Sequence, residues 1–302
     1  MRLLITGSNG LLGQKLVSLL HQNTEIELLA TSRGDNKLAN VFPLVNFRKL
    51  DIVKVEEVNR VFAEFKPTHV INTAAQTNVD ICETERKAAY EMNAVSAQNL
   101  VSACEQYNTH LNHVSTDFIF DGEAGPYDET AKPNPVNYYG QTKLAAEEMV
   151  MKGKMPWAIA RTVLVYGVVH DYGRSNIVLW VKSSLEAGKT IQVVNDQFRT
   201  PTLAEDLAMG CWLISQKNAT GIYNISGTDF LTPYEMALQV AVYFKLDGSL
   251  IQKTDGSQFV QPAKRPPRTG FIIDKARRDL GYQPHSFREG IGIVAGQLKE
   301  GV

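Results

Sequence analysis

The sequence predicts an α/β fold, in which helices cover both faces of a doubly wound parallel sheet and a smaller C-terminal lobe follows. Apolar runs alternate with amphipathic stretches through the first half of the chain, and a glycine-rich loop separates the first run from the first stretch. After residue 166 this alternation weakens, and proline and glycine become frequent. With 302 residues, the chain can form one large domain and an attached lobe.

The predicted strands and helices of the first half alternate along the chain. Apolar residues recur at three- and four-residue spacing in the stretches that predict helices. The predicted strands cover 2–6, 26–31, 68–73 and 113–120, and the helices cover 11–21, 55–65 and 86–107. Two further units follow, a helix over 139–152 with a strand over 156–166, and a helix over 203–216 with a strand over 221–226.

The remaining segments predict the lobe. Residues 167–200 and 228–302 are less regular, with further helices near 232–245 and 286–299. We expect this part to lie at the carboxyl ends of the strands, where open α/β sheets bind ligands.

The charge balance and the cysteine content argue against several classes of function. Thirty-one Lys and Arg nearly balance thirty-two Asp and Glu, so no basic field favours nucleic acid or an anionic membrane. No apolar run approaches the roughly 18 residues that span a bilayer, and the N-terminal run is too short for a signal peptide. The three cysteines form no paired motif, and no His, Cys and carboxylate cluster has metal-ligand spacing. We therefore expect a cytoplasmic protein without a metal site.

The loop over residues 7–13 predicts a dinucleotide cofactor. Gly7 permits a tight turn after the first strand, Gly10 lets the backbone approach a pyrophosphate, and Gly13 lets helix and strand pack closely. Asn9, Leu11 and Leu12 complete this loop. The prediction is a Rossmann dinucleotide-binding domain over 1–166, its sheet completed by 203–227, with a substrate-binding lobe over 167–302.

The end of the second strand favours NADP(H), with NAD(H) as the alternative. A carboxylate there would bind the free ribose 2′-hydroxyl of NAD, but the chain has Ser32 and Arg33. A hydroxyl and a guanidinium suit the 2′-phosphate of NADP. Arg33 could equally be a solvated loop residue.

Two other strand ends supply further candidate cofactor contacts. Asp51, followed by Ile52, could accept a hydrogen bond from the adenine amino group, or it could cap the next helix. Ala74, Ala75 and Gln76 end the fourth strand with mostly small residues, which could admit the cofactor or reflect close packing.

Tyr139 and Lys143 form the candidate catalytic pair. Four residues apart on a helix, they share one face, and the ammonium could lower the pKa of the phenol and hold the nicotinamide ribose. Thr116, at the end of the fifth strand, could orient a substrate carbonyl, with Ser115 as its competitor. Tyr138 competes with Tyr139 but lacks a lysine at the same spacing. By itself, Tyr-x-x-x-Lys is often only a solvated helix face.

These motifs together resemble the extended short-chain dehydrogenases/reductases. The resemblance rests on the glycine loop, on 72–75 and 115–117, on the Tyr139 and Lys143 pair, and on Arg161-Thr162. It implies that Thr116, Tyr139 and Lys143 form the catalytic set, and that Asn93 supports a proton-relay water near Lys143.

Within that group the chain most resembles the dTDP-4-dehydrorhamnose reductases, through 115–122, 195–202 and 265–267. The resemblance implies reduction of the keto group of a nucleotide-linked deoxysugar. Asp117 and Phe118 would join Thr116 at this substrate. Arg199 and Arg265 are candidates for its diphosphate, or they form surface ion pairs. One departure is Leu164, where those reductases commonly carry tryptophan.

Alternative functions remain open. Residues 126–127 and 232–237 also resemble the regulatory subunit of methionine adenosyltransferase, which keeps the fold but serves as a partner protein. A sugar-nucleotide epimerase or dehydratase would use the same cofactor loop. A dehydratase normally has an Asp-Glu pair where this chain has Asp117-Phe118, which argues against that class. A homodimer is also compatible with the sequence.

Overall fold

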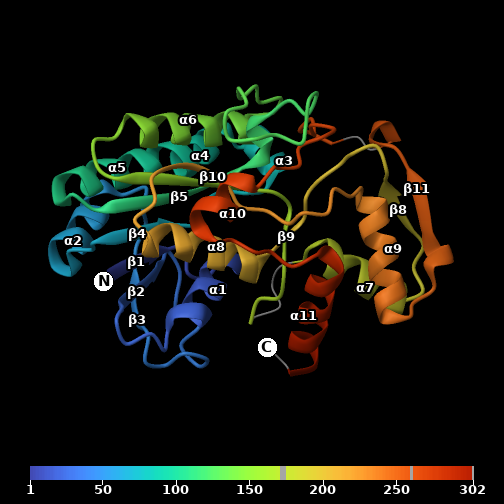
Figure 1. Ribbon diagram of the computed structural model, residues 1–302, viewed down its shortest axis with the longest axis horizontal. Coiled ribbons are helices and arrows are strands. Elements are labelled where there is room, and N and C mark those ends of the chain that lie inside the picture. Colours follow the sequence, from blue (N-terminus) through green and yellow to red (C-terminus); the bar gives the residue numbers. More distant parts are fainter. Residues whose placement is uncertain (171–174, 259–260, 301–302) are drawn as a thin grey trace.

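A seven-stranded parallel sheet forms the centre of the computed structural model, which describes residues 1–170, 175–258 and 261–300 (Figure 1). The strand order is β10-β6-β5-β4-β1-β2-β3. The strands are β1 (Arg2–Thr6), β2 (Glu27–Ser32), β3 (Asn46–Lys49), β4 (His69–Asn72), β5 (His110–Thr116), β6 (Trp157–Thr162) and β10 (Gly221–Asn224). This arrangement confirms the predicted fold class. Because the chain order reverses between β1 and β4, their carboxyl ends open a crevice for a ligand.

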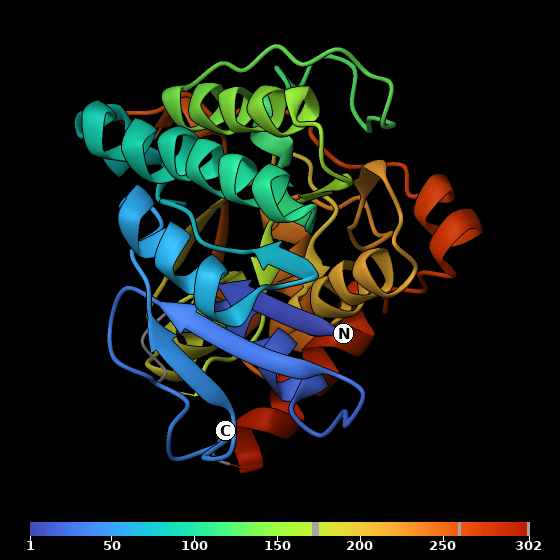
Figure 2. The ribbon, with the colours of Figure 1, turned by 90° about the vertical axis from the view of Figure 1, so that its left-hand side faces the viewer.

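Helices cover both faces of the sheet (Figures 1 and 2). One face carries α1 (Leu11–Leu20) and α8 (Ala204–Gln216), and the other carries α2 (Val55–Phe65), α5 (Ser96–Tyr107) and α6 (Tyr138–Lys152). In α2, Val58, Val61, Phe62 and Phe65 are buried at the helical spacing that predicted this element. Within the described ranges, none of the helices is long and apolar enough to cross a bilayer.

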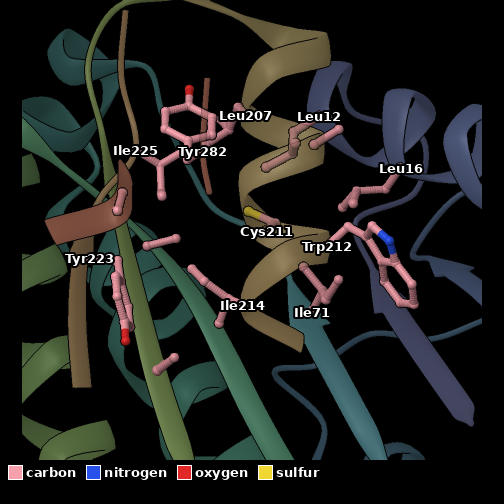
Figure 3. Close-up of a cluster of buried hydrophobic side chains, with 14 of the residues drawn as sticks. Leu12, Leu16, Ile71, Leu207, Cys211, Trp212, Ile214, Tyr223, Ile225 and Tyr282 are labelled. Carbon is pink, nitrogen blue, oxygen red and sulfur yellow. The ribbon is translucent and has the colours of Figure 1, made fainter. Parts of the chain in front are cut away.

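The core beneath α1 and α8 is close-packed. Leu12 and Leu16 of α1 lie beside Cys211 and Trp212 of α8 (Figure 3), and Ile71 of β4 belongs to the same cluster. This packing fixes the start of α1, where the glycine loop ends, against the main sheet.

The lobe has its own core. It contains α7 (Ile177–Glu186), α9 (Pro233–Phe244) and α11 (Phe287–Glu300), with a small parallel sheet of β8 (Ile191–Val194) and β11 (Ile251–Thr254). Helix α9 begins with a capping box, in which Thr232 and Glu235 bond each other's backbone N–H groups. The short strands β7 (Val165–Tyr166) and β9 (Thr202–Leu203) pair separately. Residues beyond 228 also return to the main domain, since α10 (Asp274–Leu280) packs beside α8 and β10.

Three predicted elements differ from those observed. The strand predicted over 113–120 is β5, which spans His110–Thr116; Thr116 then accepts a hydrogen bond from the backbone of Phe118, and residues 117–119 form a 3₁₀ turn. The strand predicted over 156–166 is split into β6 and β7, because Leu164 adopts a left-handed conformation (φ 37°).

The helix predicted over 86–107 is also divided. It consists of α4 (Arg86–Tyr90), a π-helical turn over Glu91–Val95, and α5. The turn contains Asn93, and such turns are frequent at functional sites. The preceding helix α3 (Val79–Thr84) was not predicted.

Candidate active site

A cleft of 840 Å³ lies at the carboxyl ends of the central strands and reaches into the lobe. Most of the residues that the sequence singled out line this cleft. These are Gly10, Leu11, Leu12, Gly13, Ala75, Gln76, Thr116, Asp117, Phe118, Tyr139, Lys143, Arg199 and Arg265. The other candidates, outside this lining in the described part of the chain, are Gly7, Asn9, Ser32, Arg33, Asp51, Ile52, Ala74 and Asn93.

The glycine loop has the shape that a pyrophosphate requires. Gly7 has φ 74°, and a Cβ atom on Gly13 would lie 2.3 Å from the Gly7 carbonyl oxygen, so a side chain at Gly13 would separate helix from strand. Gly10 is the N-cap residue of α1 and contributes no capping side chain. The helix N-terminus therefore faces the cleft and can bind an anion.

Asn9 of the predicted glycine loop and Asp51, a predicted adenine contact, both hydrogen-bond to the backbone of nearby loops. Asn9 donates to the carbonyl of Asp35 (2.7 Å) and accepts from the N–H of Lys37 (3.1 Å), so it fixes the loop after β2. Arg33 is exposed in that loop. Asp51 accepts from the N–H of Val53 (3.1 Å) in the turn before α2, and the N-cap residue of α2 is Lys54, so the predicted capping role of Asp51 is wrong. The adenine contact stays a prediction.

Tyr139 is held deep in the cleft by the start of α6. The side chain of Asn137 caps this helix by accepting from the N–H of Gly140 (2.8 Å). The ring of Tyr139 packs edge-on against Phe118. Burial raises the pKa of the Tyr139 phenol, and a hydrogen bond with Thr116 opposes this shift. The pKa thus moves opposite to the predicted direction, because burial, aided by the charge of Asp117, outweighs the hydrogen bond with Thr116. At neutral pH the phenol carries its proton.

Thr116, and not Ser115, shares a hydrogen-bonded group with Tyr139. The hydroxyl of Thr116 donates to Asp117 Oδ1 (3.1 Å). Burial raises the pKa of Asp117, although Arg199 opposes the shift. The hydroxyl of Ser115 is buried, with no partner in the described residues.

Lys143 occupies the floor of the cleft. Its Nζ atom donates to the carbonyl oxygen of Val114 (2.7 Å) and lies 3.1 Å from His113 Nε2. Burial lowers the pKa of Lys143 to about 8, and the charge of Glu147 opposes this shift. The ammonium is therefore the main form at pH 7, but it is easily deprotonated above pH 8.

Arg161 and Glu147 form a buried ion pair that the sequence did not predict. Arg161 Nε and Nη2 donate to Glu147 Oε1 and Oε2 at 3.0 and 2.7 Å, and the side chains are 2% and 0% exposed. This ion pair joins α6 to β6 one turn beyond Lys143. Arg161 lies in one of the motifs that carry the family resemblance, but no local pattern indicated its partner.

Removing one member of this pair should destabilise the protein strongly. We expect Glu147→Gln to lower the free energy of unfolding by about 3–5 kcal/mol, because a buried guanidinium loses its counter-charge. Chemical denaturation measures this loss, and Glu148→Gln on the neighbouring exposed position is the control. Equal midpoints for the two variants would show that the ion pair does not anchor the helix.

Both candidate diphosphate ligands already have protein partners. Arg199 Nη1 and Nη2 donate to the carbonyls of Phe198 and Pro266, each at 2.7 Å, and Nε lies 3.7 Å from Asp117. Arg265 forms a bidentate ion pair with Asp80 (2.6 and 2.7 Å). Their role in substrate binding stays a prediction. It requires each arginine to give up at least some of these protein contacts for contacts with the diphosphate.

Asn93 holds the loop that follows β4. Its side chain accepts from the N–H of Gln76 (2.8 Å) and donates to the carbonyl of Gln76 (3.1 Å) and to Thr142 Oγ1 (2.9 Å). The relay role implied by the family resemblance is a prediction that these contacts do not test. Across the described residues, no group of three or more His, Cys, Asp or Glu side chains could hold a metal ion.

Comparisons with known proteins place these features in a family. The model of the RmlD substrate binding domain matches residues 1–299. The dTDP-4-dehydrorhamnose reductase of Aggregatibacter actinomycetemcomitans is 31% identical, over 96% of this chain and 97% of that protein. The methionine adenosyltransferase 2 subunit beta of Bos taurus is 30% identical, over 96% and 86%.

Comparison with solved structures supports the same family. The crystal structure of dTDP-4-dehydrorhamnose reductase from Bacillus anthracis, in complex with NADP, has a TM-score of 0.87 at 30% identity, covering 98% of this chain and 99% of that one. The predicted family resemblance is thereby confirmed. The chain belongs to the RmlD substrate binding domain family.

Proposed function

We propose that the chain uses NADPH to reduce the 4-keto group of a dTDP-linked deoxysugar, as in dTDP-4-dehydrorhamnose reduction. The observation that carries this proposal is one shared cleft. Thr116, Tyr139 and Lys143 line the same cavity as the N-terminus of α1. The lobe closes that cavity with Gln197 and Arg199, so a substrate held by the lobe would meet the catalytic set.

The chain's own groups can manage the proton and the developing charge. When bound, the reduced nicotinamide supplies a hydride equivalent to the carbonyl carbon. Thr116 donates a hydrogen bond to the carbonyl oxygen, and Tyr139 donates the proton that the oxygen needs. The raised pKa of Tyr139 keeps this proton available in the resting protein. Lys143 stabilises the phenolate that remains and hydrogen-bonds the ribose hydroxyls.

A second candidate is a regulatory subunit that binds the cofactor without turnover. The similarity to the methionine adenosyltransferase 2 beta subunits favours it, at an identity close to that of the reductase. Retention of Thr116, Tyr139 and Lys143 in one cleft supports catalysis instead.

A substrate panel followed by NADPH absorbance tests the proposed function. The panel pairs dTDP and UDP with 4-keto-6-deoxysugars, and adds simple ketones as controls. We expect oxidation of NADPH with dTDP-4-dehydrorhamnose and little with the simple ketones. Tight NADPH binding without turnover of any keto-sugar would favour the regulatory alternative.

The cofactor preference makes a separate prediction at Arg33. We expect Arg33→Ala to weaken NADPH binding by about 1–3 kcal/mol, the range for a charge-assisted contact, with little change for NADH. Fluorescence titration with both cofactors measures this difference. An equal loss for NADPH and NADH would show that Arg33 does not read the 2′-phosphate.

A further inference from the structure

We propose that His113 is a positioning residue that fixes the Nζ atom of Lys143 and thereby directs the lysine toward the cofactor ribose and Tyr139. The inference rests on the proposed function for its kinetic consequences. It rests on geometry alone for its effect on cofactor affinity.

Two acceptors on β5 hold the lysine. Nζ lies 2.7 Å from the carbonyl oxygen of Val114 and 3.1 Å from His113 Nε2. His113 is 1% exposed and Lys143 is 3% exposed, so bulk water does not substitute for either contact. An amine fixed at two points on one strand has its remaining bonding direction defined. Lys143 lines the cleft, so that direction is available to the ribose and the phenol.

His113 is itself fixed by a chain of polar groups across the sheet. Its Nδ1 atom lies 3.0 Å from the side-chain amide of Asn72 on β4, and the other end of that amide lies 2.6 Å from Thr6 Oγ1 on β1. Thr6 immediately precedes Gly7, the first residue of the glycine loop. The chain of contacts therefore connects the loop expected to bind the pyrophosphate with the lysine expected to bind the ribose.

The imidazole acts here as a neutral group. Burial and the adjacent Lys143 charge hold the pKa of His113 well below its usual range. A neutral ring offers one lone pair and one N–H, so it accepts from the Lys143 ammonium at Nε2 and donates at Nδ1, which requires the amide oxygen of Asn72 to face the ring. Glu147 on the same helix, paired with Arg161 of β6, also acts on the charge of the lysine, and Tyr139 and Asp117 line the same cleft.

This role is separate from that of Asn93. The described hydrogen bonds of Asn93 go to Gln76 and Thr142, whereas those of Lys143 go to β5. The position of the lysine therefore depends directly on His113.

Two substitutions of the same histidine separate positioning from packing. In His113→Gln the longer side chain can place an amide near the position of Nε2, whereas in His113→Asn the shorter one can replace only Nδ1. We expect His113→Asn to weaken NADPH binding and to lower kcat, each by about 10- to 100-fold, because the lysine loses its alignment. The KM for the keto-sugar should stay within about twofold. His113→Gln should restore most of both losses.

A pH profile and a matched control complete the test. The alkaline limb of kcat should move by about half a pH unit or more in His113→Asn and return in His113→Gln, since the surroundings of Lys143 change only in the first variant. His110→Asn changes another buried histidine of β5, whose Nε2 atom bonds the carbonyl of Ala219, and should leave NADPH affinity unchanged.

The result that overturns the proposal is wild-type NADPH affinity and kcat in a folded His113→Asn protein, with folding checked by circular dichroism. Equal losses in His113→Asn and His113→Gln would overturn it too, because they would assign His113 to packing. If the wild-type protein reduces no keto-sugar, the proposed function fails, while NADPH affinity still decides the role of His113.

Discussion

Replacement of Tyr139 by phenylalanine is expected to lower turnover by about 100- to 10,000-fold, the range for a lost general acid. The variant removes the proton donor but keeps the buried ring that packs against Phe118. NADPH affinity and the KM for the keto-sugar should therefore change little. Steady-state kinetics with NADPH absorbance, together with a fluorescence titration of the cofactor, separates these quantities.

Tyr138 provides the matched control for this experiment. It precedes Tyr139 on the same helix. The guanidinium of Arg86 lies over its ring, with Cζ 4.9 Å from the ring centroid. We expect Tyr138→Phe to retain turnover within about threefold, because removal of the hydroxyl from this partly buried side chain leaves that ring contact intact. Wild-type turnover in Tyr139→Phe would refute the assignment of the proton donor.

The second large effect is expected at Gly10, where a valine should abolish NADP(H) binding. A Cβ atom there would lie 3.2 Å from the Gly7 carbonyl oxygen, and the rest of the side chain would enter the cleft at the N-terminus of α1. An anion could then no longer approach the helix N–H groups. Calorimetry should detect no binding at cofactor concentrations that saturate the wild-type protein.

The control for Gly10→Val is a glycine in open space. A Cβ atom added to Gly248 would meet no described atom within 4 Å, so Gly248→Val should bind NADPH normally. Unchanged affinity in a folded Gly10→Val protein would contradict the assignment of the phosphate-binding loop.

Local patterns were sufficient to predict the main sheet and most of its helices. In α2 the apolar residues from Val58 to Phe65 follow helical spacing, and the first strand has an apolar run over residues 3–5. The glycine loop and the Tyr139–Lys143 spacing were equally readable, since each depends on residues close together in the sequence.

The elements that sequence reasoning missed depend on contacts between distant segments. The start of β5 contains polar residues that suggested no strand, but Asn112 donates to the carbonyl of Cys211 and His110 bonds the carbonyl of Ala219. The contact of His113 with Lys143 also joins separate elements. No local periodicity reports such pairs, because a buried polar residue is stabilised only by the partner it meets after folding.

Transfer of a hydride from NADPH to a nucleotide-linked keto-sugar is the activity that the cleft residues together support. The most direct test supplies the wild-type protein with dTDP-4-dehydrorhamnose and NADPH deuterated at C4 of the nicotinamide, on each face in turn, and follows the sugar product by mass spectrometry. We predict that one face gives a product with a single deuterium on the former carbonyl carbon, in amounts equal to the NADPH consumed. Tight cofactor binding with no deuterium in any sugar product from either face would contradict this activity.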